Sequence, residues 1–478
     1  PSPTGYMHIG TLHTALFDYF LARQTGGQFI IRIEDTDQAR LVEGALENLL
    51  KTLKSLGIEH DEGPILQADG SVAEQGDCGP YVQSKRLDIY KKYVDQLVEQ
   101  GDAYHCFCSK ERLDVMREQQ RATKQTPKYD RHCLSLSKDE INKRLEAGEP
   151  HVIRMKIPEG ITEFEDAVRG SVKFNNSDVD DQVILKSDGF PTYHLAVVVD
   201  DALMNITHIF RGEEWLSSTP KQILLFKMLG LEAPTFAHLP LLLNPDKTKL
   251  SKRQGDVAVE DYLKKGYLPE ALLNFIGTLG FNPTGDREIY SLQELIEMFN
   301  LGKVKKSGAV MNLEKLDWMN NHYIMQLEID ELIERARPFV SINLDDAMIN
   351  RALIIQRARI NHLDQLQQSL EAYVTEFAYN PELLVWKKSD KQDAKIQLEN
   401  LKQFILQLED ALFVNVESVE REVRAYITSN NLDNGSVLWP LRVALSGQEK
   451  SSSPFELLWV FGKEKGIEKI ETAIGMLG

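Results

Sequence analysis

The pattern of apolar and polar positions differs between the N-terminal and C-terminal parts of the chain, and this change divides the chain into regions. In the N-terminal part, the apolar positions of residues 11–23 predict a helix, and the run 28–33 predicts a buried strand after a glycine pair. The acidic residues 34–37 then offer N-cap side chains for a helix that extends through Gly57. Helix, strand and helix in this order predict a parallel α/β sheet. Ligands of such sheets bind at the carboxyl ends of the strands, where Glu34 falls.

Residues 86–190 differ in composition and pattern from the segments on either side, which predicts an insertion into the α/β fold. They contain a cysteine pair, a polar helical stretch over 111–124 and β-like pieces such as 151–156. The α/β pattern resumes at 192–201 and continues through a helix that begins near Thr219. We therefore expect one nucleotide-type fold that is interrupted by a smaller domain.

Beyond Ile324 the pattern is helical throughout. No glycine occurs from residue 324 to residue 434, and the only prolines there are Pro338 and Pro381. Apolar side chains recur at helical spacing, as in residues 401–408. This predicts an all-α C-terminal third that divides into two bundles near Pro381.

Composition limits the class of protein. A chain of 478 residues exceeds the usual size of one domain, so about two to four domains are expected. No apolar run reaches membrane-spanning length, and four cysteines are too few for a disulfide framework in a chain of this length. We therefore expect a protein of the reducing cytoplasm without a membrane partner.

The net charge of −17 argues against indiscriminate nucleic-acid binding, because a nucleic acid would have to meet local basic patches.

Two short motifs carry the chemistry. The chain opens with Pro-Ser-Pro-Thr-Gly-Tyr-Met-His-Ile-Gly-Thr over residues 1–11, at the start of the first predicted helix. A helix start presents unpaired N–H groups and a positive dipole that suit a phosphate. Residues 249–253 read Lys-Leu-Ser-Lys-Arg, and these cations can neutralise charge on a reacting triphosphate. Taken singly, the first motif also fits a strand–turn–helix junction with a packed histidine, and the second a solvated basic loop.

Together the motifs resemble the HIGH and KMSKS signatures of class I aminoacyl-tRNA synthetases, and the surrounding sequence resembles the bacterial glutamyl-tRNA synthetases over the whole chain. The resemblance implies that ATP and L-glutamate form glutamyl adenylate, and that the glutamyl group then moves to the 3′ end of tRNA(Glu). No residue need act as nucleophile or general base, because the substrate carboxylate attacks ATP directly and catalysis is alignment and charge stabilisation. The resemblance also implies Mg²⁺ with ATP, a monomer, and efficient activation only with tRNA present.

The resemblance assigns the ATP site. His8 and Lys252 are expected to stabilise the transition state at the α-phosphorus, and Gly10 lets the nucleotide approach the backbone closely. Apolar walls for adenine are expected from Trp215 and Leu242. The full set of expected ATP contacts is His8, Gly10, Thr11, Trp215, Leu242, Lys249, Ser251 and Lys252.

Glutamate needs a cation for its side-chain carboxylate and an anion or dipoles for its ammonium group. Arg211 suits the first need and Glu34 the second, and the resemblance adds Ser2 and Tyr193 to the glutamate site. Taken alone, Arg211 also fits a surface ion pair. Two departures from the family pattern matter. A family arginine is expected upstream of the opening motif, before residue 1, and an asparagine of some relatives is Val197 here.

Three cysteines close together in sequence suggest a metal site, although structural zinc takes four ligands. In zinc-bearing glutamyl-tRNA synthetases a histidine completes the site at the position that is Ser135 here. In the related glutamyl-queuosine enzymes a tyrosine at the spacing of Tyr129 does so. His132 is a third candidate, and reduced cysteines in a small subdomain are the alternative without metal. We expect one Zn²⁺ held by Cys106, Cys108, Tyr129 and Cys133.

The C-terminal part carries the expected RNA contacts. Residues 313–320 resemble the junction between the catalytic and anticodon-binding parts of the family. Residues 357–359, Arg-Ala-Arg, resemble the site where an arginine reads the last anticodon base. Arg359 is therefore expected to pair with a base edge, and a solvated helix face is the alternative. Lysines 387, 388 and 391 are candidates for phosphate contacts.

The resemblance implies an α/β fold with a Rossmann-type parallel-sheet catalytic domain, an inserted α+β acceptor-binding domain and an all-α anticodon-binding region. The expected boundaries are 1–85 and 191–245 for the two Rossmann halves, 86–190 for the acceptor-binding insertion, 246–323 for a stem-contact domain with the lysine loop, and 324–380 and 381–478 for two anticodon-binding bundles.

A glutamyl-queuosine enzyme fits less well because it lacks the C-terminal third, and glutaminyl-tRNA synthetase because it carries β-barrels there. A non-discriminating form that also charges tRNA(Gln), and a catalytically silent tRNA-binding paralogue, stay open.

Overall fold

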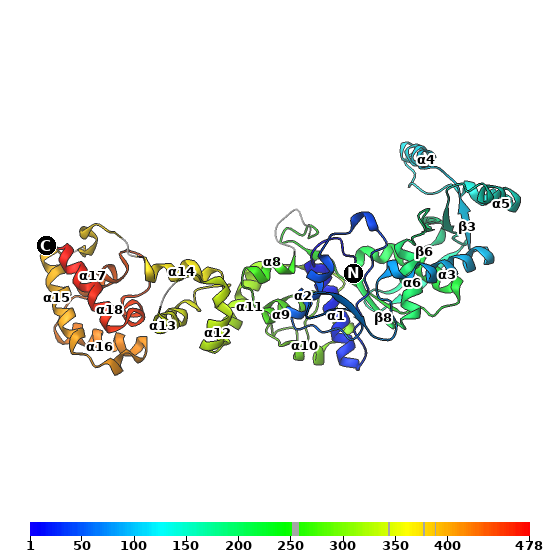
Figure 1. Ribbon diagram of the computed structural model, residues 1–478. Coiled ribbons are helices and arrows are strands. Elements are labelled where there is room, and N and C mark those ends of the chain that lie inside the picture. The colour runs from blue at the N-terminus through cyan, green and yellow to red at the C-terminus, as the bar shows by residue number, and fades with distance from the viewer. Residues whose placement is uncertain (251–257, 343–344, 376–377, 388) are drawn as a thin grey trace. The chain divides into compact units, whose positions relative to one another are not determined.

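The structure is a computed structural model that describes residues 1–478 except 251–257, 343–344, 376–377 and 388 (Figure 1). The chain forms two compact units. The first unit comprises residues 1–263 and 269–316, and the second comprises residues 264–268 and 317–478.

The first helix of the first unit forms as its apolar pattern predicts. Helix α1 (Ile9–Thr25) buries an apolar face that includes Leu16 and Phe20. It begins at His8, whose ring caps the helix, and it ends at Gly26, whose φ of 69° suits a residue without Cβ. The helix predicted over residues 11–23 is therefore confirmed and is slightly longer at both ends.

The strand and helix predicted next differ from the prediction. Residues 28–33 are extended but form isolated parallel bridges, Ile30 with Glu62 and Ile33 with Val82, rather than a continuous strand. Helix α2 (Ala45–Ser55) begins well after the acidic residues 34–37, so the prediction that these residues cap it is wrong. Asp37 instead precedes a short 3-10 helix, Gln38–Arg40, without a side-chain capping bond, and the Asp35 carboxylate accepts a hydrogen bond from the Ser84 backbone N–H at 2.8 Å.

The remaining elements of the first unit complete an α/β body. Its further helices are α3 (Leu87–Gln100), α4 (Lys110–Ala122), α5 (Lys138–Glu146), α6 (Tyr193–Leu203), α7 (Thr219–Leu229), α8 (Val259–Lys264), α9 (Pro269–Gly277) and α10 (Leu292–Met298). Its strands are β1 (Gly63–Leu66), β2 (Val72–Gln75), β3 (Ala103–Cys106), β4 (Val152–Met155), β5 (Ile161–Asp166), β6 (Gly170–Asn175), β7 (Val183–Leu185), β8 (His208–Gly212), β9 (Thr235–Leu239), β10 (Leu242–Leu243) and β11 (Ala309–Val310).

Two larger sheets organise this body. Strands β3, β4 and β7 form an antiparallel sheet, and a second sheet has the order β6-β5-β9-β8. In the second sheet β9 runs parallel to both β8 and β5, and its register places Arg211 of β8 directly beside His238 of β9. The second sheet therefore joins strands from both sides of residue 190, where the sequence predicts the end of the insertion. Helices α3, α6 and α7 pack with these sheets in one apolar core that includes Leu195 and Phe226.

Helices α4 and α5 lie at one end of the first unit, beyond β3 (Figure 1). Neither helix contains a fully buried residue, although Leu113 and Met116 of α4 pack against the cluster that contains Tyr129. Arg112 and the Asp130 carboxylate form an ion pair at 2.5 Å between α4 and the loop that follows it. Two polar helices attached to a small sheet fit the prediction made from the composition and pattern of residues 86–190.

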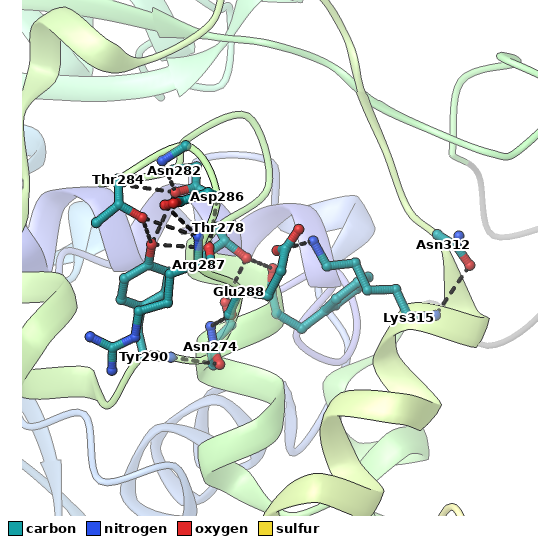
Figure 2. A network of polar contacts seen from close by, with 12 residues as sticks. Asn274, Thr278, Asn282, Thr284, Asp286, Arg287, Glu288, Tyr290, Asn312 and Lys315 are labelled. Carbon is teal, nitrogen blue, oxygen red and sulfur yellow. Dashed lines mark hydrogen bonds and ion pairs between the residues drawn. The ribbon is translucent and has the colours of Figure 1, made fainter.

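A network of polar side chains fixes the loop of residues 282–288 in the first unit (Figure 2). The Asn282 side-chain oxygen accepts hydrogen bonds from the backbone N–H groups of Thr284 and Gly285, at 3.1 and 2.8 Å. Asn274 on α9 binds the backbone on both sides of the loop's end, donating to the Glu288 carbonyl and accepting from the Tyr290 N–H. Side chains of the loop and of α9 therefore hold the loop through hydrogen bonds to its backbone.

The second unit is helical. After β11, the described residues form only helices, turns and loops, which confirms the all-α C-terminal third. Helix α18 packs against α13, α15, α16 and α17. The helices are α11 (Leu313–Gln326), which contains the division at residue 316, α12 (Ile329–Ala336), α13 (Asp346–Gln356), α14 (Gln365–Val374), α15 (Lys391–Gln407), α16 (Val416–Ser429), α17 (Asn434–Ser446) and α18 (Pro454–Met476).

Candidate active site

A cavity of about 1100 Å³ opens in the first unit and brings distant segments together. It is lined by the opening motif, the extended segment 28–34, one side of α6, strand β8 and residues 239–242 and 249–250. The predicted site residues that line it are Ser2, His8, Gly10, Thr11, Glu34, Tyr193, Arg211, Trp215, Leu242 and Lys249. Ser251 and Lys252, the other two predicted ATP contacts, lie outside the described residues.

His8 lies at the N-terminus of α1 with a defined ring orientation. Its Nδ1 accepts a hydrogen bond from the Gly10 backbone N–H at 2.9 Å. Neutral His8 therefore carries its proton on Nε2, which is a donor suited to a phosphate oxygen. A Cβ on Gly10 would lie 3.2 Å from His8 Nδ1, so a side chain there would crowd the ring. The glycine thus preserves this cap as well as the space beside the helix start.

Arg211 is buried, with 7% of its surface exposed, and three side chains hold its guanidinium. Its Nη1 donates to Gln222 Oε1 and its Nη2 to Thr219 Oγ1, both at 2.7 Å, and its Nε donates to His238 Nε2 at 3.0 Å. Its guanidinium carbon also lies 4.9 Å from the centre of the Phe236 ring. Arg211 is therefore not part of a surface ion pair, which is the alternative for this residue taken alone. The residue is an oriented cation at the wall of the cavity.

Tyr193 and Trp215 form an aromatic part of the cavity wall. Their ring centres lie 4.7 Å apart, and Trp215 keeps 37% of its surface exposed. Burial raises the pKa of Tyr193 to about 12, so its hydroxyl is protonated at neutral pH and can donate a hydrogen bond. A flat, partly exposed indole beside a phenol hydroxyl suits a ligand with both a planar and a polar part.

Glu34 is held by a network that the sequence did not indicate. Arg32 Nη2 lies 3.2 Å from the Glu34 carboxylate, and Arg32 Nη1 binds Asp201 at 2.7 Å. Asp200 lies 3.7 Å from Arg32 Nε and 2.8 Å from the Nε of Arg86. The network places a carboxylate with a fixed orientation at the cavity. Its sequence signal is weak, since it consists of one arginine between two isoleucines and an acidic pair at the end of an apolar helix.

Lys249 is brought to the cavity by a tight turn. The Asn244 N–H bonds the Thr248 carbonyl at 2.8 Å, and the Leu250 N–H bonds the Leu242 carbonyl at 3.0 Å. Lys249 Nζ lies 3.4 Å from Glu214 and is more than half exposed. The lysine loop therefore begins at the cavity mouth.

The predicted zinc ligands gather in the first unit. The sulfur atoms of the three cysteines lie within 4.8 Å of one another, with Cys108 Sγ 3.5 Å from Cys133 Sγ. The Tyr129 hydroxyl lies 3.3 Å from both Cys106 Sγ and Cys108 Sγ, and it accepts from the Cys133 backbone N–H at 3.0 Å. His132 is exposed and is not part of this group. The structure thus brings together the four residues that the sequence singled out and leaves the histidine alternative outside.

Arg359 has partners inside the second unit. Its guanidinium binds both oxygens of Glu456 at 2.6 and 2.8 Å and donates to Ser452 Oγ at 2.7 Å. The side chain remains 41% exposed. Glu456 also caps the start of α18 through the Ser453 backbone N–H. Arg359 is therefore an oriented arginine at the surface of the helical region rather than a freely solvated one.

Comparison with known proteins identifies the family. Residues 1–318 match the family described as tRNA synthetases class I (E and Q), catalytic domain, and residues 331–474 match an anticodon binding domain. The chain is 44% identical to the glutamate–tRNA ligase of Clostridioides difficile over 485 residues, which cover 98% of this chain and 97% of the relative. The chain belongs to the glutamate–tRNA ligase family. It is also 45% identical to the glutamate–tRNA ligase of Chloroherpeton thalassium, over all of this chain and 97% of that protein.

A solved structure of the glutamate–tRNA ligase family agrees. The crystal structure of the ligase from Elizabethkingia meningosepticum in complex with its amino acid superposes with a TM-score of 0.89 at 32% identity, covering 100% of this chain and 98% of that one. The predicted family, the class of enzyme and the fold, a Rossmann-type catalytic domain followed by a helical anticodon-binding region, are thereby confirmed. The match over residues 331–474 also argues against a glutamyl-queuosine enzyme, which lacks that region. Among the helices that the structure describes, none is both long and apolar enough to span a membrane.

Proposed function

We propose that this chain joins L-glutamate to the 3′ end of tRNA(Glu) in two steps, acting as a monomer in the cytoplasm. The observation that supports the proposal is that the ten described residues predicted to contact ATP and glutamate all line one cavity. ATP and glutamate first form glutamyl adenylate and pyrophosphate. The tRNA terminus then attacks the glutamyl carbonyl, and AMP leaves as the acyl–phosphate bond breaks.

Glutamate binding uses complementary charges on opposite ends of the substrate. The Arg211 guanidinium holds the side-chain carboxylate, because a buried arginine pairs strongly with a carboxylate. The carboxylate of Glu34, oriented by Arg32, faces the ammonium group. Ser2 and the protonated Tyr193 hydroxyl supply hydrogen bonds to the rest of the molecule. Shape and charge together select an acidic amino acid.

Activation is a direct attack of the substrate's α-carboxylate on the α-phosphorus of ATP. His8 donates from Nε2 to the phosphate, and the cations of the lysine loop, Lys249 and Lys252, offset the charge that develops as pyrophosphate leaves. Trp215 and Leu242 provide the apolar contacts for adenine. Mg²⁺ bound with ATP supplies further charge neutralisation on the phosphates.

The decisive experiment is ATP–pyrophosphate exchange with glutamate, with and without tRNA. We expect exchange that depends on glutamate and on tRNA. No exchange with tRNA present would show a silent tRNA-binding paralogue instead. Charging tRNA(Glu) and tRNA(Gln) separately then determines the specificity. We propose the discriminating form, in which only tRNA(Glu) is charged, because Arg359 is presented in one orientation by Glu456.

Lys252→Ala is expected to slow activation by about 2–4 kcal/mol of transition-state stabilisation, the scale for loss of one preorganised donor. The measurement is kcat/KM in exchange with tRNA present. Lys227→Ala, at an exposed position of α7 outside the cavity lining, is the matched control and should leave exchange unchanged. Unchanged turnover in Lys252→Ala would show that the lysine assignment is wrong.

A Zn²⁺ site in the insertion is the second part of the proposal. Tetrahedral zinc with Zn–S distances of about 2.3 Å places its sulfur ligands about 3.8 Å apart, close to the observed spacing. The fourth ligand is the Tyr129 hydroxyl, whose ring is held in place by the Arg154 guanidinium 4.0 Å from its centre. Zinc here would hold β3 and the loop after α4 together and take no part in the reaction.

Metal analysis of the purified protein is expected to find one zinc per chain. Cys133→Ser should abolish binding and Tyr129→Phe should weaken it, because each removes a ligand. Cys78→Ser is the control, since this fourth cysteine lies outside the cluster. Removing zinc should loosen residues 106–133 in hydrogen exchange and leave the KM for ATP unchanged. Protein prepared in zinc-containing medium that carries no zinc would contradict the site.

A further inference from the structure

We propose that His238 is a positioning residue for glutamate recognition: it fixes the guanidinium of Arg211, and Asp166 fixes the tautomer of His238. The inference rests on the proposed role of Arg211 as the partner of the substrate's side-chain carboxylate. It adds two residues that no sequence motif indicates and assigns each a defined role.

His238 and Arg211 are paired by the sheet itself. The parallel register of β8 and β9 places them side by side, and the distance from Arg211 Nε to His238 Nε2 is 3.0 Å. His238 is completely buried, so water cannot replace it as a partner. Nε of arginine is always a donor, and the bond therefore requires His238 Nε2 to be an unprotonated acceptor.

Asp166 selects that form of the imidazole. Its Oδ2 lies 2.5 Å from His238 Nδ1, and its Oδ1 accepts from the backbone N–H groups of Val168 and Arg169 at 3.0 and 2.7 Å. A carboxylate anchored in this way accepts the Nδ1 proton, which leaves Nε2 free of a proton. Asp166, His238 and Arg211 thus form a chain in which every donor meets an acceptor.

The hydrogen bonds that link Asp166, His238 and Arg211 determine how Arg211 can hold a carboxylate. His238 occupies Nε and Thr219 occupies Nη2, and these two partners themselves lie 3.1 Å apart. The fork of the guanidinium formed by Nε and Nη2 is therefore taken by the protein. Nη1 donates one of its two N–H groups to Gln222, so a carboxylate in the cavity is left with the second N–H of each terminal nitrogen and meets these two donors in a single orientation. Without His238 the Nε donor loses its acceptor, and Thr219 and Gln222 alone hold the guanidinium less firmly in the orientation that bidentate binding requires.

Two substitutions of His238 separate positioning from simple packing. In His238→Asn the amide lies near the position of Nδ1, so it can still bind Asp166 but does not reach Arg211. In His238→Gln the side-chain oxygen reaches the position of Nε2 and can accept from Arg211. We expect His238→Asn to raise the KM for glutamate roughly 10- to 100-fold, the range for one hydrogen bond to a charged group, and His238→Gln to restore most of that loss. The KM for ATP and that for tRNA should stay within about twofold in both variants.

Asp166→Asn tests the tautomer. An amide at this position can donate to Nδ1, which moves the imidazole proton to Nε2 and sets two donors, Nε2 and Arg211 Nε, against each other. The variant should therefore reproduce the rise in glutamate KM although residue 166 does not contact the cavity. His60→Gln, a histidine bonded to the Pro64 carbonyl outside the cavity lining, is the control for loss of a histidine hydrogen bond.

A double-mutant cycle with Arg211→Met completes the experiment. His238→Asn should have no further effect on glutamate KM once Arg211 is gone, because its action passes through that side chain. A full effect in the Arg211→Met background would overturn the proposal, and so would equal changes in the KM for glutamate, ATP and tRNA. If Arg211→Met itself leaves the glutamate KM unchanged, the proposed function of Arg211 fails, and that result is separate from any effect at His238.

Discussion

Replacing Arg211 by methionine is expected to lower kcat/KM for glutamate by roughly 30- to 4,000-fold, the equivalent of about 2–5 kcal/mol for removing one partner of a buried, hydrogen-bonded charge pair. The physical reason is the low exposure of the site: Arg211 is 7% exposed, so a substrate carboxylate that enters would be left without water and without a cation. Methionine fills a similar volume, and the cavity wall keeps its shape. The measurement is tRNA-dependent aminoacylation with glutamate varied.

Arg211→Lys tests whether charge alone suffices. Lysine keeps the charge but cannot bind His238, Thr219 and Gln222 together while presenting two parallel donors, so we expect it to recover only a small part of the loss. Arg287→Met, at a half-exposed arginine outside the cavity, should behave as the wild type. A methionine variant with the glutamate KM of the wild type would remove Arg211 from the substrate site.

The sequence predicted the parts of the site that are local in the chain. His8 and Gly10 lie two residues apart, and the cap that they form depends only on the start of an apolar helix. The cysteines and Tyr129 likewise fall within 28 residues of one another, so one small subdomain brings them together. In both cases the chemistry depends on residues that lie close together in the sequence, so it can be predicted without knowledge of the fold.

The partners that orient the site residues could not be predicted in this way. His238 meets Arg211 only because β9 lies parallel to β8 in one register, and a register is a property of the whole sheet. Asp35 offers the same N-cap chemistry as any aspartate before a helix, but the fold carries it to the Ser84 backbone instead. Local propensity predicted the wrong helix start here, because Asp35 bonds a backbone far away in sequence and Asp37 precedes only a short 3-10 helix.

Asp200→Ala is expected to destabilise the first unit by about 3–5 kcal/mol, the scale for leaving buried charges without their partner. The Asp200 side chain is fully buried and accepts hydrogen bonds from Arg86, Gln83 and Tyr90, each at 2.8 Å. The Arg86 side chain is only 2% exposed and would lose its anion, and Arg32, 3.7 Å away, would lose part of the field that orients it toward Glu34. We therefore expect a lower unfolding midpoint and a raised glutamate KM in the same variant.

Hydrogen exchange followed by mass spectrometry locates this effect, because the chain has two compact units and a single midpoint does not describe both. Peptides of α3 and α6, which carry Tyr90 and Asp200, should exchange faster, while α15 to α18 in the second unit should be unaffected. The control is Asp95→Ala, which removes an exposed ion pair with Lys91 on α3 and should change little, since such pairs contribute weakly. An Asp200→Ala protein as stable as the control would mean that Arg86 and Arg32 find other partners. The acidic pair that ends the apolar helix would then serve the site through Asp201, which binds Arg32 and lines the cavity beside Glu34.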